Sequence, residues 1–275
     1  MIRLTLGLGL LGLLAAAAMG APMLQQALGH DPFAPDLFSR YQPPSVEHPL
    51  GTDDLGRDLL LRLLFGARVS MTVGIAVALG ATLLGTTIGL LAAWHGGWAE
   101  EVLMRLADGM LALPALPLLV VLAAVDTGRF GLPRGEAASD IARITIILVL
   151  FGWVGVARLA RAAALRELAQ DYIAAARIAG ASEARVLARH VLPNIAGPIT
   201  VATALAVGGA ILAESTLSFL GLGIQPPAPS WGNMLSNAQE MVFSAPLVAV
   251  WPGLAILLAV AGCTLTADGL RARLP

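Results

Sequence analysis

The sequence contains no lysine, only one cysteine and few charged residues. All 17 basic residues are arginines, and the 275-residue chain is 57% hydrophobic and 13% charged. Without lysine there is no phosphate-binding P-loop, which places a lysine on the β- and γ-phosphates, and no Schiff-base lysine. The single cysteine, Cys263, excludes an intramolecular disulfide and a cysteine-rich metal site. The net charge of −1 gives no basis for expecting nucleic-acid binding.

The composition indicates a protein that crosses a membrane several times. Its mean hydropathy is +0.79, and soluble domains carry about 25% charged residues, roughly twice the fraction found here. A helix of about 20 apolar residues crosses the hydrocarbon core of a bilayer. We therefore predict an all-α protein with six transmembrane helices, at residues 4–24, 71–94, 109–125, 141–161, 195–213 and 246–267.

Three of these spans allow a second interpretation or have unusual content. Residues 4–24 also fit a secretory signal peptide, but the run is long for one and more spans follow, so we expect an uncleaved helix. Pro114 and Pro117 fall within the third span, where neighbouring helices can satisfy the carbonyls that a proline frees. The fourth span must include Arg143 or Arg158, and we expect such side chains to reach the membrane surface.

The distribution of arginine sets the expected orientation. Ten of the 17 arginines lie on one side if both termini lie there. Basic residues favour cytoplasmic loops, so we predict cytoplasmic termini and extracytoplasmic loops at 25–69, 126–140 and 215–244. The chain then divides into residues 1–69 (first helix and long loop), a five-helix core at 70–270 and a tail at 271–275. The six arginines between spans four and five are Arg158, Arg161, Arg166, Arg177, Arg185 and Arg189.

The span centres contain no carboxylate, which disfavours an ion-coupled secondary transporter. Asp108 lies at the inner start of the third span and Glu214 at the outer end of the fifth. We expect Glu214 to pair with an arginine of a neighbouring segment, with a place along the transport pathway as the alternative. Hydroxyls and backbone carbonyls also bind ions, so a secondary transporter or channel remains an alternative, as does a scaffold without transport.

Residues 169–194 predict two short helices on the cytoplasmic side. Asp171 can cap a helix over 172–179, and Gly180 can end it in the left-handed conformation that glycine tolerates. Ser182 can cap a second helix, which Pro193 would stop before the next span. The first helix has a small, smooth alanine surface that could fit a groove on a partner. Packing on the end of the bundle itself is the alternative.

This segment resembles the EAA loop of ABC importer permeases. The pattern of that loop is Glu-Ala-Ala, three residues, Gly and, after a longer gap, Leu-Pro. Here it is three alanines at 174–176, then Gly180 and Leu-Pro at 192–193, with the same spacing. Ala174 replaces the glutamate, which removes any salt bridge or hydrogen bond of that side chain but keeps the helix–glycine–helix shape.

Three further stretches carry the resemblance along the chain. HPLGTDDLGRDLLLRLLFGARVS (48–70) resembles the HxLGTDxxGRD…GAR signature of the dipeptide, oligopeptide and nickel branch, as does AESTLSFLGLGIQPPAPSWGNML (213–235). GGWAEEVLMRLADGMLALP (96–114) is similar to the stretch that enters the third span. The motifs occur in the family's order and most resemble the C-type permease subunit, although the usual Asp-Pro-Arg-like tail is missing.

The resemblance implies a type I ABC importer permease that is not itself an enzyme. Its implied partners are a second permease subunit, forming a heterodimer, two ATPase subunits and an extracytoplasmic substrate-binding protein, all at the bacterial inner membrane and its lipid bilayer. ATP and Mg²⁺ would be bound by the ATPases, with no cofactor in this chain. Peptides are the implied solute, with a nickel chelate or another small solute as the alternative, because the binding protein largely sets selectivity.

By the same resemblance, a coupling contact with the ATPases falls on the first cytoplasmic helix and the turn after it. The expected residues are Tyr172, Ala174, Ala175, Ala176, Ile178, Gly180, Ala181 and Ser182. Arg185 and Arg189 would lie near acidic ATPase surface or anionic lipid.

Two extracytoplasmic loops hold the remaining candidates. In the first, an arginine paired with a nearby aspartate would fix the loop, and contact with the binding protein is the alternative. In the second, prolines and a tryptophan suggest a rigid loop seated at the membrane interface, which gates the pore or meets the binding protein. These residues are Asp53, Asp54, Arg57, Asp58, Gln225, Trp231 and Asn233. We predict no metal site, because the four histidines lie in separate loops.

Overall fold

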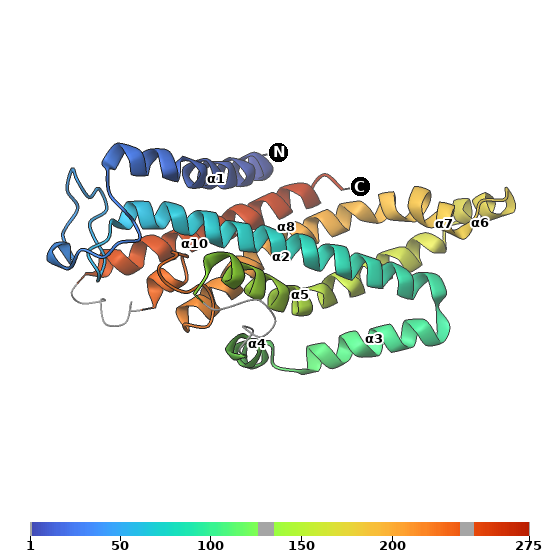
Figure 1. Cartoon of the computed structure of the whole chain (residues 1–275). Helices are drawn as coiled ribbons and strands as arrows, with labels where there is room; N and C mark the ends of the chain where they lie inside the picture. The colour runs from blue at the N-terminus through green and yellow to red at the C-terminus, as the bar shows by residue number, and fades with distance from the viewer. Residues whose placement is uncertain (1, 126–134, 237–244, 275) are drawn as a thin grey trace.

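The computed structural model describes residues 2–125, 135–236 and 245–274. Five long helices run along a single bundle (Figure 1). Each is long and apolar enough to cross a membrane, α8 being counted together with the short helical turns before it. The helices are α1 (Ile2–Leu28), α2 (Leu59–His95), α5 (Ala137–Leu168), α8 (Leu192–Phe219) and α10 (Pro246–Arg271).

The observed helices extend beyond the predicted spans. Helix α2 begins at Leu59, well before residue 71, and Asp58 caps it by accepting a hydrogen bond from the Leu61 N–H at 2.8 Å. Helix α5 continues past residue 161 to Leu168. A hydropathy scan stops at the first charged side chain, whereas a helix continues through charged residues that are paired or lie outside the hydrocarbon layer. The span centres are therefore correct and their ends are short.

The third predicted span is not a straight helix. Helix α3 (Gly97–Ala112) and helix α4 (Ala115–Ala124) meet at an angle of 88°. Leu113 between them is extended, with φ −84° and ψ 138°. Because the ring of Pro114 disfavours the helical conformation at the residue before it, the helix ends there. By length and hydropathy the two helices together qualify as one broken span or as a re-entrant loop, with the bend at Pro114.

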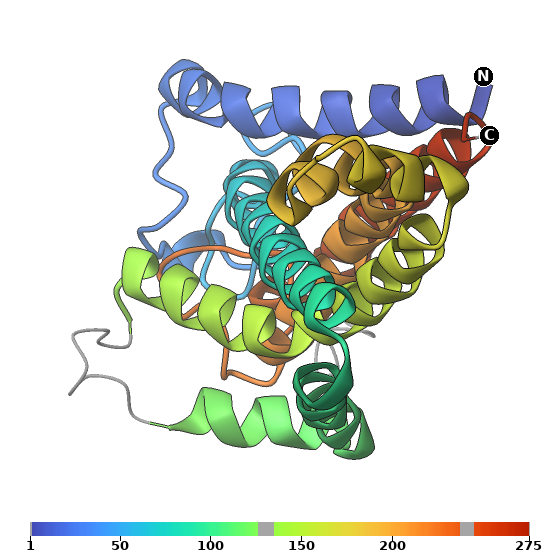
Figure 2. The same cartoon turned by 90° about the vertical axis from the view of Figure 1, so that its right-hand side faces the viewer.

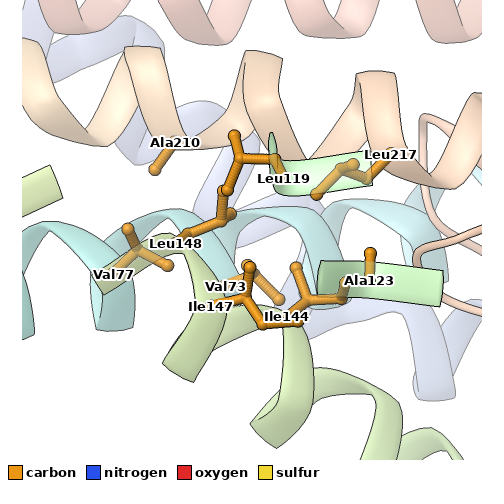
Figure 3. Close-up of a cluster of buried hydrophobic side chains, with 9 residues drawn as sticks. All are labelled: Val73, Val77, Leu119, Ala123, Ile144, Ile147, Leu148, Ala210 and Leu217. Carbon is orange, nitrogen blue, oxygen red and sulfur yellow. The ribbon is translucent and has the colours of Figure 1, made fainter. Parts of the chain in front are cut away.

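Helix α4 packs against the bundle through two of its side chains. Its Leu119 and Ala123 side chains enter a buried apolar cluster contributed by α2, α5 and α8 (Figure 3). This burial compensates for the break at Pro114, because a short apolar helix gains most of its stability from packing. The other members of the cluster are Val73, Val77, Ile144, Ile147, Leu148, Ala210 and Leu217.

The long helices approach one another through glycines. A Cβ added at Gly85 of α2 would lie 2.5 Å from the Trp153 carbonyl oxygen of α5. On the other side of the bundle, Gly7 of α1 faces Thr266 of α10, and Gly269 of α10 faces Leu4. Small residues allow such backbone contact in membranes, where van der Waals packing drives helix association.

The two ends of the bundle differ in content. One end carries residues 29–58, which include a short 3-10 helix, η1 (Leu37–Ser39). The other end is formed by α6 (Asp171–Ile178) and α7 (Glu183–Val186), and the terminal ends of α1 and α10 point toward it (Figure 1). The view along the bundle from this end places α1 and the α3–α4 pair on opposite sides (Figure 2). Parts of the predicted loops 126–140 and 215–244 lie outside the described residues.

Candidate functional site

Helices α6 and α7 project from one end of the bundle (Figure 1). The base of α6 is anchored by Ile173, which is fully buried in an apolar cluster with residues of α5 and α8. Its start is held by Tyr172, whose hydroxyl accepts a hydrogen bond from the Asn194 side chain at 2.8 Å. Gln170, not Asp171, is the cap residue, so the predicted cap is wrong by one position and Asp171 lies in the first turn.

The turn between the two helices is defined by backbone hydrogen bonds. Gly180 adopts φ +86°, as predicted. The Gly180 N–H donates to the Arg177 carbonyl and the Ala181 N–H donates to the Ala176 carbonyl, both at 3.0 Å, which is the Schellman arrangement at a helix C-terminus. Ser182 then caps α7 by accepting from the Arg185 N–H at 3.4 Å, which confirms the predicted second cap.

The predicted stop at Pro193 is wrong. A single π-helical turn, η3 (Leu187–Val191), joins α7 to α8, and the Leu192 N–H donates to the Leu187 carbonyl. This wider turn changes the hydrogen-bond register just before the proline. Pro193 therefore sits in the first turn of α8, where its missing N–H costs little. Helices α6 and α7 are thus connected to α8 without a flexible linker.

The outward surface of α6 is small and apolar. Ala174, Ala175 and Ala179 are exposed, and Ile178 at the tip is 88% exposed. Ala176 is half-buried and faces inward toward the turn. An isoleucine on a smooth alanine face gives a convex apolar tip that fits a partner's groove. The coupling contact itself stays a prediction.

An ion pair crosses the turn between α6 and α7. The Arg177 Nε donates to one carboxylate oxygen of Glu183 at 2.8 Å, and a terminal nitrogen donates to the other at 3.0 Å. Both side chains remain partly exposed. The hydrogen bond with Glu183 raises the pKa of Arg177 above its ordinary value. This ion pair was not predicted from the sequence, although Arg177 and Glu183 flank the predicted glycine turn.

At the opposite end of the bundle, Asp53 binds two arginines. The predicted pairing is confirmed, because Arg57 Nε donates to Asp53 at 2.8 Å. Arg62 of α2 lies 3.2 Å from the same carboxylate oxygen and donates to the Pro32 carbonyl at 3.0 Å. All three side chains are almost completely buried. Arg62 was missed because it lies in a leucine-rich run. The one local signal was its position four residues after Asp58.

The loop after α8, described for residues 220–236 and called the second outer loop after its predicted location, packs into the bundle. Trp231 is 1% exposed, and its indole N–H donates to the Leu63 carbonyl of α2 at 3.1 Å. The ring therefore packs against α2, and the position of the loop at the membrane interface stays a prediction. Asn233 closes the loop on itself by donating to the Ile224 and Ala228 carbonyls. Gln225 is held through its N–H, which donates to Asp140 at 3.1 Å.

The two outer loops meet at a small cavity of about 150 Å³. Asp53, Asp54 and Arg57 line it from the first loop, and Asn233 lines it from the second. The sequence assigned these residues to separate loops, and the structure brings them together. Asp58 is oriented differently: it caps α2 and lies 2.9 Å from the His48 ring. A contact with a binding protein remains a prediction for all of them.

Glu214 of α8 is fully buried, but its partners are serines. The hydroxyls of Ser70, Ser218 and Ser215 donate to its carboxyl oxygens at 2.9, 2.6 and 3.4 Å. The Ser70 oxygen also accepts a hydrogen bond from the Trp231 N–H at 3.2 Å. The predicted arginine partner is wrong, because serine hydroxyls, two from α8 itself and one from α2, satisfy the carboxyl group. This cluster joins α2, α8 and the second outer loop.

We expect Glu214→Leu to loosen the second outer loop, whereas Glu214→Gln should retain it. Leucine leaves buried hydroxyls without acceptors, at about 1–3 kcal/mol each, while glutamine keeps one carboxamide oxygen in place. The measurement is the thermal unfolding midpoint in detergent together with protease cleavage within residues 220–236. Equal stability of the leucine and glutamine variants would show that the hydroxyls do not depend on Glu214.

Arg143 does not reach the membrane surface as predicted. Its side chain is 2% exposed, lies 3.2 Å from Asp140 and donates to the Gly223 carbonyl at 3.1 Å. Arg158 is exposed and lies 3.7 Å from Asp108. Burial of Arg143 is possible because carbonyls and a carboxylate replace water around its guanidinium group.

The histidines are not all separate, contrary to the sequence expectation. The rings of His30 and His48 lie 4.6 Å apart between centroids. Within the described ranges, no group of three or more His, Cys, Asp or Glu side chains could hold a metal ion.

The family model named binding-protein-dependent transport system inner membrane component matches residues 85–275. The chain belongs to this family. It is a permease subunit of an ABC importer, and ATP is hydrolysed by separate ATPase subunits of the transporter. Permeases of this family work with ATPase and binding-protein partners at the inner membrane. The matched region includes α6 and α7.

The relatives and a solved structure support the same assignment. A putative peptide transport system permease protein of Brucella suis is 38% identical over 97% of this chain and 85% of its own length. The oligopeptide permease protein OppC of Bacillus subtilis is 35% identical over 96% and 82%. The glutathione permease protein GsiD of Pectobacterium atrosepticum is 39% identical over 83% and 72%. An inward-facing structure of the MetNI methionine ABC transporter has a TM-score of 0.61 at 15% identity, covering 76% of this chain and 95% of that chain, which supports the fold.

Proposed function

We propose that this permease imports peptides. The support is the agreement among relatives of 35–39% identity, whose names specify peptides, oligopeptides and the tripeptide-like glutathione. A nickel chelate or another small solute is the alternative, because a binding protein that delivers the solute controls what the permease receives. The chain would act as one half of a heterodimer with a second permease subunit.

The function depends on α6 docking into a cleft of an ATPase subunit. The observation that supports it is the convex alanine face with the exposed Ile178 at the tip of the bundle. Two ATPases would dock on the permease pair, one on each subunit. Closure of the ATPases on ATP would move α6, and the π-helical turn would pass that motion to α8 without a flexible joint. ATP and Mg²⁺ would stay in the ATPases.

This assignment makes the α6–α7 end cytoplasmic. The terminal ends of α1 and α10 point toward that end (Figure 1), and the arginine bias agrees with it. The loops around Asp53 and Trp231 then face the binding protein outside. Because Trp231 is buried and Asn233 closes its own loop, the second loop would meet a partner as a rigid surface and not as a separate flap.

Reconstituted transport tests the proposal. The chain is co-expressed with the products of its genomic neighbours, purified and placed in proteoliposomes with enclosed ATP. We expect uptake of labelled di- or oligopeptide that requires both the binding protein and ATP and persists with a proton uncoupler. Uptake that ignores ATP and is abolished by the uncoupler would establish ion-coupled transport. Uptake of a nickel chelate but no peptide would overturn the peptide assignment alone.

A further inference from the structure

We propose that the ion pair between Arg177 and Glu183 is a positioning element that fixes the angle between α6 and α7 during coupling. This inference rests on the proposed docking of α6. Arg177 lies in the last turn of α6, and Glu183 is the first residue of α7. The pair therefore spans the turn at Gly180 and connects the helix that would touch the ATPase to the helix that leads into the membrane.

Backbone hydrogen bonds do not fix the angle between α6 and α7. The Schellman hydrogen bonds fix the end of α6, and the Ser182 cap fixes the start of α7. Between these two closed ends, Ala181 is the one link, and no helical hydrogen bond crosses it. Gly180 adds a position with wide conformational freedom. Ile173 of α6 and Val186 of α7 are anchored in one buried apolar cluster, and the ion pair is the side-chain contact that joins the two helices across the turn itself.

The geometry of the pair suits this role. Two parallel hydrogen bonds, at 2.8 and 3.0 Å, hold the planar guanidinium in one orientation relative to the carboxylate. Exposed ion pairs generally contribute little to stability, and ideal bidentate geometry is the exception. Each charge also lies at a favourable helix end, the arginine at a C-terminus and the glutamate at an N-terminus.

The pair gains importance from the alanine at position 174. The resemblance places a glutamate there in the EAA pattern, and this chain has an exposed alanine. A carboxylate contact is therefore absent from this position, and the carboxylate that Arg177 binds is that of Glu183, across the turn. Motion of α6 would then reach α7 and α8 through the pair.

A double-mutant cycle of Arg177→Gln, Glu183→Gln and the combined variant tests the inference. The whole transporter is assembled with its ATPases, and the readout is peptide imported per ATP hydrolysed. We expect each single variant to lower this ratio about fivefold, the factor that corresponds to the upper value for an exposed pair. The combined variant should be no worse than either single one, because both remove the same interaction. ATPase subunits should co-purify with all of them.

Arg105→Gln is the matched control, since Arg105 forms an exposed ion pair with Glu101 of the same helix, α3, away from the turn between α6 and α7. It should leave the ratio unchanged. Multiplied losses in the combined variant would mean that the two side chains act separately on the ATPase, and unchanged single variants would mean that the pair has no role; either overturns the inference. If ATPases fail to bind the wild-type chain, the proposed function itself fails.

Discussion

Ala175→Trp is expected to prevent assembly of the ATPase subunits with this permease. Ala175 is exposed on the smooth face of α6, beside the tip formed by Ile178. An indole there would overlap with any groove shaped for a methyl group, and overpacking costs about 1–3 kcal/mol, which corresponds to roughly 5- to 150-fold weaker binding. The measurement is the ratio of ATPase to permease after affinity purification, followed by peptide uptake in proteoliposomes.

Ala188→Trp is the control for this variant. Ala188 is an exposed alanine of the π-helical turn, on the same projection but nearer to the bundle. It should retain the ATPase ratio of the wild type, because a large side chain there does not cover the α6 face. Normal assembly with the tryptophan at position 175 would place the docking surface elsewhere.

Gly89→Leu is expected to prevent formation of a stable bundle. Gly89 of α2 lies against the backbone of α5, and an added Cβ would lie 2.8 Å from Ala160 Cβ and 2.9 Å from the Arg161 nitrogen. Backbone atoms cannot rotate away as a flexible side chain does, so the two helices must separate. We expect a cost at or above the usual 1–3 kcal/mol of overpacking, about the margin that a membrane bundle can lose before it fails to assemble.

The yield of monodisperse protein and its thermal unfolding midpoint in detergent measure this effect. Gly9→Leu in α1 is the matched control, because a Cβ at Gly9 meets no atom within 4 Å and the residue is exposed. It should fold as the wild type does. Equal yields and midpoints for the two variants would show that α2 and α5 can separate without loss of the fold.

Local patterns predicted several parts of the structure correctly. Five spans appear as apolar helices where uncharged runs occur, because length and hydropathy decide whether a helix fits a bilayer. The turn at Gly180 and the Ser182 cap also follow from adjacent residues, since capping hydrogen bonds join positions two to five apart. The family resemblance depended on the same local motifs, and the family match confirms it.

Two of the errors share one physical cause, because each concerns a contact between distant segments. Glu214 finds Ser70 on another helix, and Arg143 finds the Gly223 carbonyl in the second outer loop. Neither partner can be read from the residues next to it. Hydropathy also treats a charged side chain as a boundary, although paired burial removes that penalty.

The sequence by itself determined the number of apolar runs, the helix–glycine–helix turn and membership of the importer permease family, because these depend on composition and on neighbouring residues. The tertiary structure alone decided where α4 packs after the break at Pro114, that Arg62 joins Asp53 and Arg57, and which polar groups share a buried site. Those outcomes depend on which helices pack together, and burial makes hydrogen bonds between distant residues obligatory.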